Sequence, residues 1–381
     1  MSYDVVIVGA GIEGLSTARY LTTQLGRGKV LLVEQFSWPH CRGSSHGATR
    51  MTRRSYNDMA YAMLTPVAFE RWKELENESN IRLYRQTGLL IMAPSDSKYV
   101  RQFRATMDAK GYSYEALDSE RIMKKFPQFN VPQGYESFIE HGGIFRDNEP
   151  VVEIIPACKT GTSHDHWTTI KTRNEVYHAR LGVIITVGPW APSFLSEKLK
   201  LDLPIESHKT LFCYWKISSP GAYDIDNGTP LTLVKRRGER WTYYSKPQLE
   251  FDGITQIGLH IGTETHPDNR DNPAKTSQLE DFYIRKSREF GAEFMPYLDV
   301  ANGPVIVDKC LYTENMVDAG FVLDRHPEHP DIVIGTGFSG QGFKLAPVVA
   351  EILGNLVLNR PPPPHVDMKK FSLSRLIKSK I

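Results

Sequence analysis

A strand, a glycine turn, a helix and a second strand near the amino terminus constrain the fold of this chain more than any other feature. The apolar residues 5–8 lead into the glycine-rich residues 9–14, and a second apolar run at residues 30–33 ends at Glu34. An unbroken apolar strand is typical of a parallel sheet that is covered on both faces. The order of these parts predicts a dinucleotide-binding βαβ unit of the Rossmann type, and therefore an α/β fold.

The glycines and the acid of this unit each have a distinct task in binding a nucleotide. Gly9 permits a tight turn, Gly11 lets backbone N–H groups approach a pyrophosphate, and Gly14 lets the helix pack closely on the strand. Glu34 ends the second strand, where a carboxylate accepts hydrogen bonds from an adenosine ribose. A glycine turn without a ligand is the alternative to a binding site. The motif does not distinguish FAD from NAD.

Charge and composition limit the partners of this chain. Its 381 residues are 40% hydrophobic and 24% charged, with a formal net charge of +2, as expected of a globular protein of about two domains. The balanced charge and the lack of a basic stripe argue against a nucleic-acid partner. No apolar run approaches the roughly 18 residues that would span a membrane. The scattered cysteines lack CxxC spacing, so we expect neither a metal site nor a disulfide framework.

The carboxyl-terminal residues predict a cellular address. Ser379-Lys380-Ile381 is a conservative variant of the Ser-Lys-Leu tripeptide that peroxisomal import receptors read, and a basic segment precedes it. A frayed basic tail is the alternative, since a three-residue signal is easily met by chance. Four consecutive prolines at residues 361–364 are stiff and extended. We therefore expect the folded part to end there and residues 361–381 to form a tail.

Strands of the nucleotide-binding type recur in the middle and near the end of the chain. One at residues 181–187 ends at Gly188-Pro189-Trp190, and another at residues 332–334 ends in glycines. Between them, residues 211–261 show the alternation of an antiparallel sheet. A discontinuous dinucleotide domain is therefore expected to enclose a mainly antiparallel substrate domain, with the site at their junction. The expected ranges are 1–85, 140–205 and 305–360 for the dinucleotide domain, and 86–139 and 206–304 for the substrate domain.

A second glycine cluster at residues 335–344 is the most distinctive later motif. A strand that ends in glycines and opens a helix points backbone N–H groups and a positive dipole end at an electron-rich group. Together with the amino-terminal unit and Cys310-Leu311-Tyr312-Thr313, this cluster resembles the FAD-dependent amine oxidases of the glycine and D-amino-acid oxidase superfamily. The chain is most similar to the branch of the monomeric sarcosine oxidases and peroxisomal sarcosine/L-pipecolate oxidases. Residues 45–50, 188–190 and 338–347 also follow the family's order, so the resemblance covers nearly the whole chain.

The resemblance implies an FAD cofactor and assigns roles to several polar side chains. Cys310 matches the cysteine that bonds covalently to the 8α-methyl carbon of the flavin. Arg53 and Lys344 match the cationic pair that holds the substrate carboxylate, a task suited to a guanidinium fork and a point charge. Arg50 matches an arginine that lies against the flavin. The alternatives are a buried thiol that acts as a small hydrophobe and three surface cations.

Aromatic residues complete the site that the resemblance implies. Tyr244 and Tyr312 match tyrosines that line it, and His260 matches a histidine next to the substrate amine. As isolated residues, tyrosines and a strand histidine are more often part of the core. The resemblance implies the following cofactor-binding positions: Gly9, Gly11, Gly14, Glu34, His46, Thr49, Arg50, Val152, Gly188, Trp190, Cys310, Gly340, Gly342 and Lys344.

One departure from the family pattern concerns O2. Four residues before the histidine, the oxidases carry a lysine near the flavin that is implicated in activating O2, and this chain has Gln256. A cation near developing superoxide is worth on the order of a few kcal/mol at ~4 Å in a partly screened site, or roughly two to three powers of ten in rate. We therefore expect slow reoxidation by O2, which a Gln256→Lys change should accelerate.

A second departure is a shortened segment at residues 127–143. The family places a strand and a long helix there, and the dozen or so residues available are too few for both. The missing helix would cover the sheet of the flavin domain. We therefore expect uncovered apolar surface on that sheet and weaker retention of FAD.

The activity that the resemblance implies is the oxidation of a secondary amino acid. A hydride equivalent leaves the carbon next to an N-methyl or cyclic amine, as in sarcosine or L-pipecolate. The resulting imine hydrolyses, and O2 is reduced to H2O2. The alternatives are an amine dehydrogenase with poor O2 reactivity, a flavin-binding protein without amine oxidase activity, and an NAD-dependent dehydrogenase. We expect a monomer whose partners are the amino acid, O2 and the peroxisomal import receptor.

Overall fold

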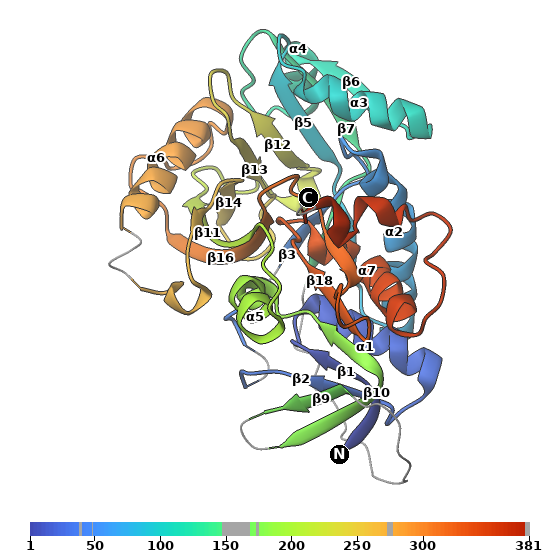
Figure 1. Ribbon diagram of the computed structural model, residues 1–381. Coiled ribbons are helices and arrows are strands. Elements are labelled where there is room, and N and C mark those ends of the chain that lie inside the picture. The colour runs from blue at the N-terminus through green and yellow to red at the C-terminus, as the bar shows by residue number, and fades with distance from the viewer. Residues whose placement is uncertain (38–39, 48, 147–167, 173–174, 273–276, 378–381) are drawn as a thin grey trace.

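The computed structural model describes residues 1–37, 40–47, 49–146, 168–172, 175–272 and 277–377. Within these residues, two large sheets and one small sheet pack with the helices (Figure 1). The α-helices are α1 (Ile12–Leu25), α2 (Met59–Ser79), α3 (Tyr99–Lys110), α4 (Ser119–Lys125), α5 (Ala191–Leu199), α6 (Ser277–Phe294) and α7 (Gly342–Val357). The 3-10 helices are η1 (Gly188–Trp190), η2 (Ile225–Asn227), η3 (Pro267–Asn269), η5 (Met368–Lys370) and η6 (Leu373–Arg375). None of the helices in the described ranges is long and apolar enough to cross a membrane.

The amino-terminal unit belongs to a sheet whose strands follow the order β17–β18–β10–β1–β2. Strand β1 pairs in parallel with β2 and β10, and β10 pairs in parallel with β18, whereas β9 and β17 are antiparallel to their neighbours. The bounds are β1 (Ser2–Val8), β2 (Val30–Val33), β9 (Thr168–Lys171), β10 (Val176–Ile185), β17 (Val322–Arg325) and β18 (Ile332–Thr336). This is the sheet that the Rossmann-type pattern predicts, so the α/β fold class is confirmed.

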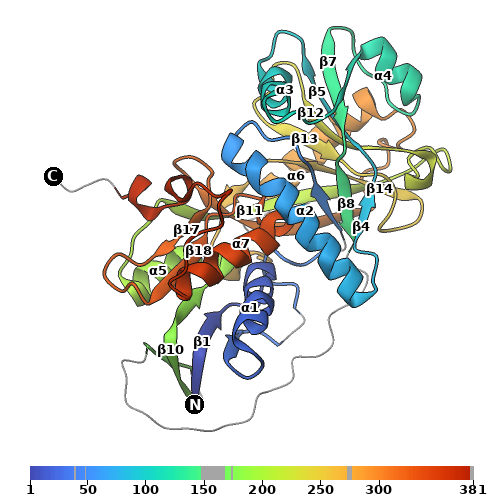
Figure 2. The same cartoon turned by 90° about the vertical axis from the view of Figure 1, so that its right-hand side faces the viewer.

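Helices α1 and α7 pack together against one face of this sheet (Figure 2). The shared core includes the buried side chains of Val5, Val333 and Leu353. Gly354 in α7 permits the close contact between the helices, because a Cβ there would collide with the ring of Tyr20 in α1. Both helices follow parallel strands, so their amino ends lie at the same edge of the sheet.

The second large sheet has the strand order β15–β11–β14–β13–β12–β5–β7–β6, with β16 paired to β11. All of its pairs are antiparallel except that of β5 and β12. Helix α6 packs on one face, where the rings of Phe290 and Tyr243 stack at 4.8 Å. The bounds are β5 (Leu89–Pro94), β6 (Glu115–Asp118), β7 (Tyr135–Glu140), β11 (Ile205–Lys216), β12 (Leu231–Lys235), β13 (Thr242–Ser245), β14 (Ile254–Leu259), β15 (Thr263–Glu264) and β16 (Ile306–Asn315). The small sheet is β3 (Thr49–Thr52), β8 (Gly143–Arg146) and β4 (Tyr84–Gln86).

Residues 127–143 contain the strand β7 and no helix, in keeping with the short segment noted in the sequence. Strand β7 pairs with β5 and β6, and Gly142 leads directly into β8. On the face of the first sheet opposite α1, Leu31 and Val33 of β2 are only half-buried among the described residues.

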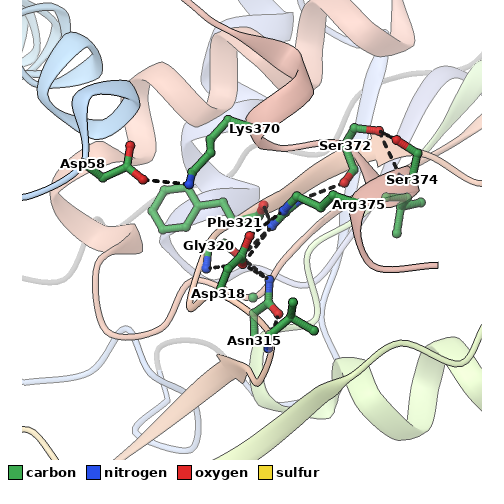
Figure 3. A network of polar contacts seen from close by, with 12 residues as sticks. Asp58, Asn315, Asp318, Gly320, Phe321, Lys370, Ser372, Ser374 and Arg375 are labelled. Atoms are coloured by element: carbon green, nitrogen blue, oxygen red, sulfur yellow. Dashed lines mark hydrogen bonds and ion pairs between the residues drawn. The ribbon is translucent and has the colours of Figure 1, made fainter. Parts of the chain in front are cut away.

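The folded part extends beyond the four prolines, where the sequence predicted its end. Phe371 and Leu373 are buried in the cores on the two faces of the first sheet. Arg375 then donates hydrogen bonds to the carboxylate of Asp318, at 2.9 Å, and to the carbonyl oxygen of Phe321, at 2.6 Å (Figure 3). Burial of apolar side chains and these hydrogen bonds hold the segment to the sheet, which the proline run alone did not reveal.

Candidate active site

A cavity of about 1910 Å³ is lined by residues from both large sheets. Its lining includes the glycine turn after β1, the end of β2, the strands β13, β14 and β16, and the amino end of α7. Among the described residues, every predicted site residue except Gly14 lines this cavity. Val152 lies outside the described residues. The structure therefore brings the predicted residues together, although they come from distant parts of the chain.

The glycine turn after β1 has the close packing that its sequence requires. Gly9 has a φ of +102°, and a Cβ there would collide with the carbonyl oxygen of Thr186. A Cβ on Gly14 would collide with the carbonyl oxygen of Gly9, so this third glycine shapes the turn without lining the cavity. The carboxylate of Glu34 accepts a hydrogen bond from the N–H of Ala10 at 2.8 Å. The acid at the end of β2 is thus held beside the turn.

Residues 43–47 and the start of β3 are fixed by two of the predicted side chains, His46 and Arg50. The ring nitrogens of His46 lie 2.6 Å from the carbonyl oxygen of Gly43 and 3.0 Å from that of Lys309 in β16. The guanidinium of Arg50 donates to several carbonyl oxygens of the loop, including that of Ser44 at 3.0 Å. His46 therefore holds this segment against β16, Arg50 ties the segment to itself, and both residues line the cavity.

Cys310 lies on β16 beside this loop. Its Sγ atom is 3.9 Å from the carbonyl oxygen of Ser44, and the residue lines the cavity. Burial raises the pKa of the Cys310 thiol, while the nearby Arg50 acts in the opposite direction. The sulfur is therefore a thiol at neutral pH that faces the same cavity as the glycine turn.

Near the amino end of α7, a glycine makes room for two aromatic rings. The ring centroids of His260 and Tyr312 are 5.7 Å apart. Gly340 has a φ of +70°, and a Cβ there would lie 2.9 Å from Cε2 of Tyr312 and 3.2 Å from Cε1 of His260. A glycine in β14 does the same for a third ring, because a Cβ on Gly258 would collide with Tyr244. Glycines thus admit three of the predicted side chains to the cavity.

Two cations and an imidazole face this part of the cavity. Burial, with a further contribution from Arg53, lowers the pKa of Lys344 to about 7. Burial lowers the pKa of His260 to about 4, and Arg53 and Lys344 add to this shift. The guanidinium of Arg53 lies 4.9 Å from the ring centroid of Tyr56, and its Nε has no hydrogen-bond partner among the described residues. At neutral pH the site therefore combines positive charge with a neutral imidazole.

Gly188 and Trp190 line the cavity from the 3-10 helix η1 that follows β10. Gly188 has a φ of +54°, which allows the sharp turn out of the strand. The indole N–H of Trp190 donates to Asp268 at 3.0 Å, and its ring lies 5.2 Å from that of Phe36. The turn is thus fixed where the first sheet meets the cavity.

Comparisons with known proteins agree with this geometry. The family model for FAD dependent oxidoreductases matches residues 4–137 and 131–356. The chain belongs to this family. It is 33% identical to peroxisomal sarcosine oxidase of Homo sapiens over 400 residues, which cover 98% of this chain and 96% of that protein. It is 31% identical to monomeric sarcosine oxidase of Bacillus sp. (strain B-0618), with the same coverage of 98% and 96%. The solved structure of NikD, an unusual amino acid oxidase, superposes with a TM-score of 0.77 at 21% identity over 97% of each chain.

The cavity of this FAD dependent oxidoreductase fits its cofactor. Its volume of about 1910 Å³ exceeds the usual range of ~300–1,000 Å³ for a small-molecule site, which leaves room for FAD and a substrate. Gly9 and Gly11 line the cavity where a pyrophosphate would approach the backbone of the turn, and Glu34 lines it where a carboxylate would accept from a ribose. At the amino end of α7, Gly342 and the N–H groups of the first turn would hold the electron-rich ring of the flavin.

Two buried ionisable residues in the cavity lining, Glu13 and Lys246, were not predicted. Glu13 lies between Gly11 and Gly14. The dinucleotide-binding pattern specifies the glycines and does not specify the residues between them. Lys246 follows Tyr244 at the two-residue spacing of a strand, so alternation could have placed it on the cavity face. That spacing is a weak signal, because strands usually direct a lysine to solvent.

Proposed function

We propose that this chain uses FAD to oxidise a secondary amino acid, N-methylated or cyclic, such as sarcosine or L-pipecolate, to an imine, with reduction of O2 to H2O2. The observation that carries this proposal is the presence of Arg53, Lys344 and His260 in the cavity that the FAD-binding residues also line. Relatives named sarcosine oxidase and N-methyl-L-tryptophan oxidase support an N-methyl amino acid as the substrate class.

In this reaction the side chains bind and orient the substrate. When bound, FAD supplies the chemistry that accepts a hydride equivalent from the carbon next to the amine. Arg53 and Lys344 hold the substrate carboxylate and so fix which C–H bond is presented, which is catalysis by positioning. The same cations disfavour a positively charged substrate amine. The neutral His260 can accept a hydrogen bond from that amine, because its pKa is lowered to about 4.

The proposed covalent bond joins Cys310 to the flavin. Its support is the position of Sγ at the cavity and the family match of the surrounding strand. Acid precipitation of the purified protein tests it, because a covalently bound flavin stays yellow in the pellet. A Cys310→Ser variant should release the colour to the supernatant, and a colourless wild-type pellet would contradict the bond.

The proposed location is the peroxisome, the proposed address is Ser379-Lys380-Ile381, and the proposed state is a monomer of two domains. The address lies outside the described residues. Relatives named peroxisomal sarcosine oxidase in Homo sapiens and Mus musculus support the location, and relatives named monomeric sarcosine oxidase support the monomer. A fluorescent fusion that keeps the free carboxyl terminus should reach peroxisomes, and removal of the tripeptide should abolish import. Light scattering of the purified protein measures its oligomeric state.

Anaerobic mixing with candidate substrates tests the activity. Sarcosine, L-pipecolate and L-proline are added separately, and loss of the yellow absorbance shows that electrons reach the flavin. A flavin-binding protein without amine oxidase activity would keep its colour with all three substrates. A dehydrogenase would bleach and then recover slowly in air, whereas an NAD-dependent dehydrogenase would show no flavin spectrum at all.

A further inference from the structure

The buried lysine Lys246 lies one strand away from Gln256. Lys246 follows β13, and its N–H donates to the carbonyl oxygen of Gln256 in β14 at 3.1 Å. Strands β13 and β14 are neighbours in the second large sheet (Figure 1). Directly paired residues on adjacent strands point to the same face of a sheet, and both of these residues line the cavity. A cation is therefore present in the same cross-strand row as the glutamine.

The ammonium of Lys246 is held by residues that face the cavity. Nζ donates to Oγ1 of Thr49 at 2.8 Å and forms an ion pair with Oε1 of Glu250 at 3.2 Å. The side chain is only 10% exposed. Arg50 and Cys310 lie close enough to interact with its charge. Lys246 therefore lines the same cavity as Cys310, to which we propose the flavin is bound.

The counter-ion lies on the other side of the lysine. Glu250 accepts hydrogen bonds from the hydroxyls of Thr49 and Tyr214 in addition to its pairing with Lys246. Among the described residues, Lys246 and Thr49 line the large cavity and Glu250 does not. Burial raises the pKa of Glu250, but the positive charge of Lys246 and the two hydroxyl donors outweigh this effect and lower it. Glu250 thus favours the charged form of Lys246, and its own negative charge is set back from the cavity.

We propose that Lys246 supplies the positive charge that stabilises negative charge on O2 when the reduced cofactor is reoxidised. This proposal rests on the proposed FAD-dependent function. O2 takes two electrons from the reduced cofactor and two protons from solution to become H2O2, and after the first electron it is the superoxide anion. A buried cation lowers the free energy of that anion more than an exposed one does, because screening by water is weak. Gln256, a neutral amide, does not replace this charge.

The test uses protein reduced with dithionite, so that it does not depend on any amine substrate. Lys246→Met should slow reoxidation by O2 by about 10-fold, allowing for partial cancellation by Glu250. It should also shift the midpoint potential of the flavin to a more negative value, because the reduced form loses a stabilising cation. Reoxidation by ferricenium, which does not become an anion, should keep its rate. Unchanged reoxidation by O2 with an unchanged potential would overturn the proposal, as would equal slowing with both acceptors.

Two further variants separate the effect of charge from damage to the sheet. Lys246→Leu combined with Gln256→Lys moves the cation to the neighbouring strand and should restore the rate that Lys246→Leu loses. Lys209→Met is the matched control, because Lys209 is also a buried lysine of this sheet and does not line the cavity. It should reoxidise like the wild type. Failure of the double variant to recover any rate would count against the proposal.

A variant of the counter-ion covers the case in which Lys246→Met does not retain FAD. Glu250→Gln removes the anion that favours the charged lysine, while burial and Arg50 continue to lower the pKa of Lys246. The charged and titratable groups that face Lys246 are Glu250, Arg50 and Cys310, with Tyr214 behind Glu250. Reoxidation of this variant should therefore slow as pH rises, more steeply than in the wild type. Identical pH profiles would contradict the role of Lys246.

Discussion

The buried carboxyl of Glu13 should make the stability of the FAD-free protein depend strongly on pH. Glu13 lies in the first turn of α1, is 6% exposed, and has no hydrogen-bond partner for either carboxyl oxygen among the described residues. A Cβ on Gly342 would lie 2.6 Å from its Oε1, so the carboxyl sits between the amino ends of α1 and α7. Burial raises the pKa of Glu13 from 4.5 to about 8. In the FAD-free protein the group is therefore protonated at neutral pH.

The size of the effect follows from this pKa. The folded pKa lies above the unfolded one, so the native state retains a proton that the unfolded state has lost between about pH 4.5 and pH 8. The free energy of unfolding therefore falls as pH rises through this window, by ~1.4 kcal/mol for each unit. Between about pH 5 and about pH 8 the expected loss from this residue is about 3 kcal/mol.

The variant Glu13→Gln removes the titration and keeps the shape of the side chain. We expect it to gain about 3 kcal/mol relative to its parent when pH is raised from about 5 to about 8. Urea unfolding of both proteins at the two pH values measures this double difference, in which the other titrating groups cancel. A Cys310→Ser background keeps the proteins free of covalent FAD. Parallel pH dependence of variant and parent would refute the reasoning.

Glu140 provides the contrasting control. It is also buried, and burial raises its pKa. Unlike Glu13, it accepts hydrogen bonds from the N–H of Arg54 at 3.1 Å and from the hydroxyl of Ser55 at 2.7 Å. Glu140→Gln disturbs these bonds, so we expect it to destabilise the protein at both pH values. If Glu140→Gln stabilised the protein instead, burial of the carboxyl and not its hydrogen bonds would determine how such a substitution changes the free energy of unfolding.

Three further outcomes are expected. Gly14→Ala should abolish FAD retention, measured as the ratio of flavin to protein absorbance, because the new Cβ collides with the carbonyl oxygen of Gly9. The affinity for acetate, measured by calorimetry, should fall as pH rises above about 7, where Lys344 loses its charge. Lys344→Met should remove this pH dependence. Arg375→Ala should lower the free energy of unfolding by about 2 kcal/mol, measured in urea, because it removes the hydrogen bonds that Arg375 donates to Oδ2 of Asp318 and to the carbonyl oxygen of Phe321.

The sequence was sufficient to predict the first sheet and much of the site. Residues 5–8 and 30–33 form neighbouring parallel strands, and the predicted site residues meet at one cavity, because their motifs carry strong local constraints such as the collision at Gly9. Their chemical roles remain predictions. The carboxyl-terminal segment was not predicted, because the burial of Phe371 and Leu373 depends on a sheet surface built from distant residues.

Lys246 shows why the electrostatics of the site could not be predicted from single positions. The match to the family compares residues one at a time, so Gln256 counts as a lost charge. The electrostatic potential at a point in the cavity depends on all nearby charges. These charges lie on several neighbouring strands and not only on the strand that carries Gln256. Antiparallel pairing puts residues 246 and 256 side by side, a relation that the order of residues does not express. A missing cation at one position therefore predicts a change in reactivity only when its cross-strand neighbours have also been inspected.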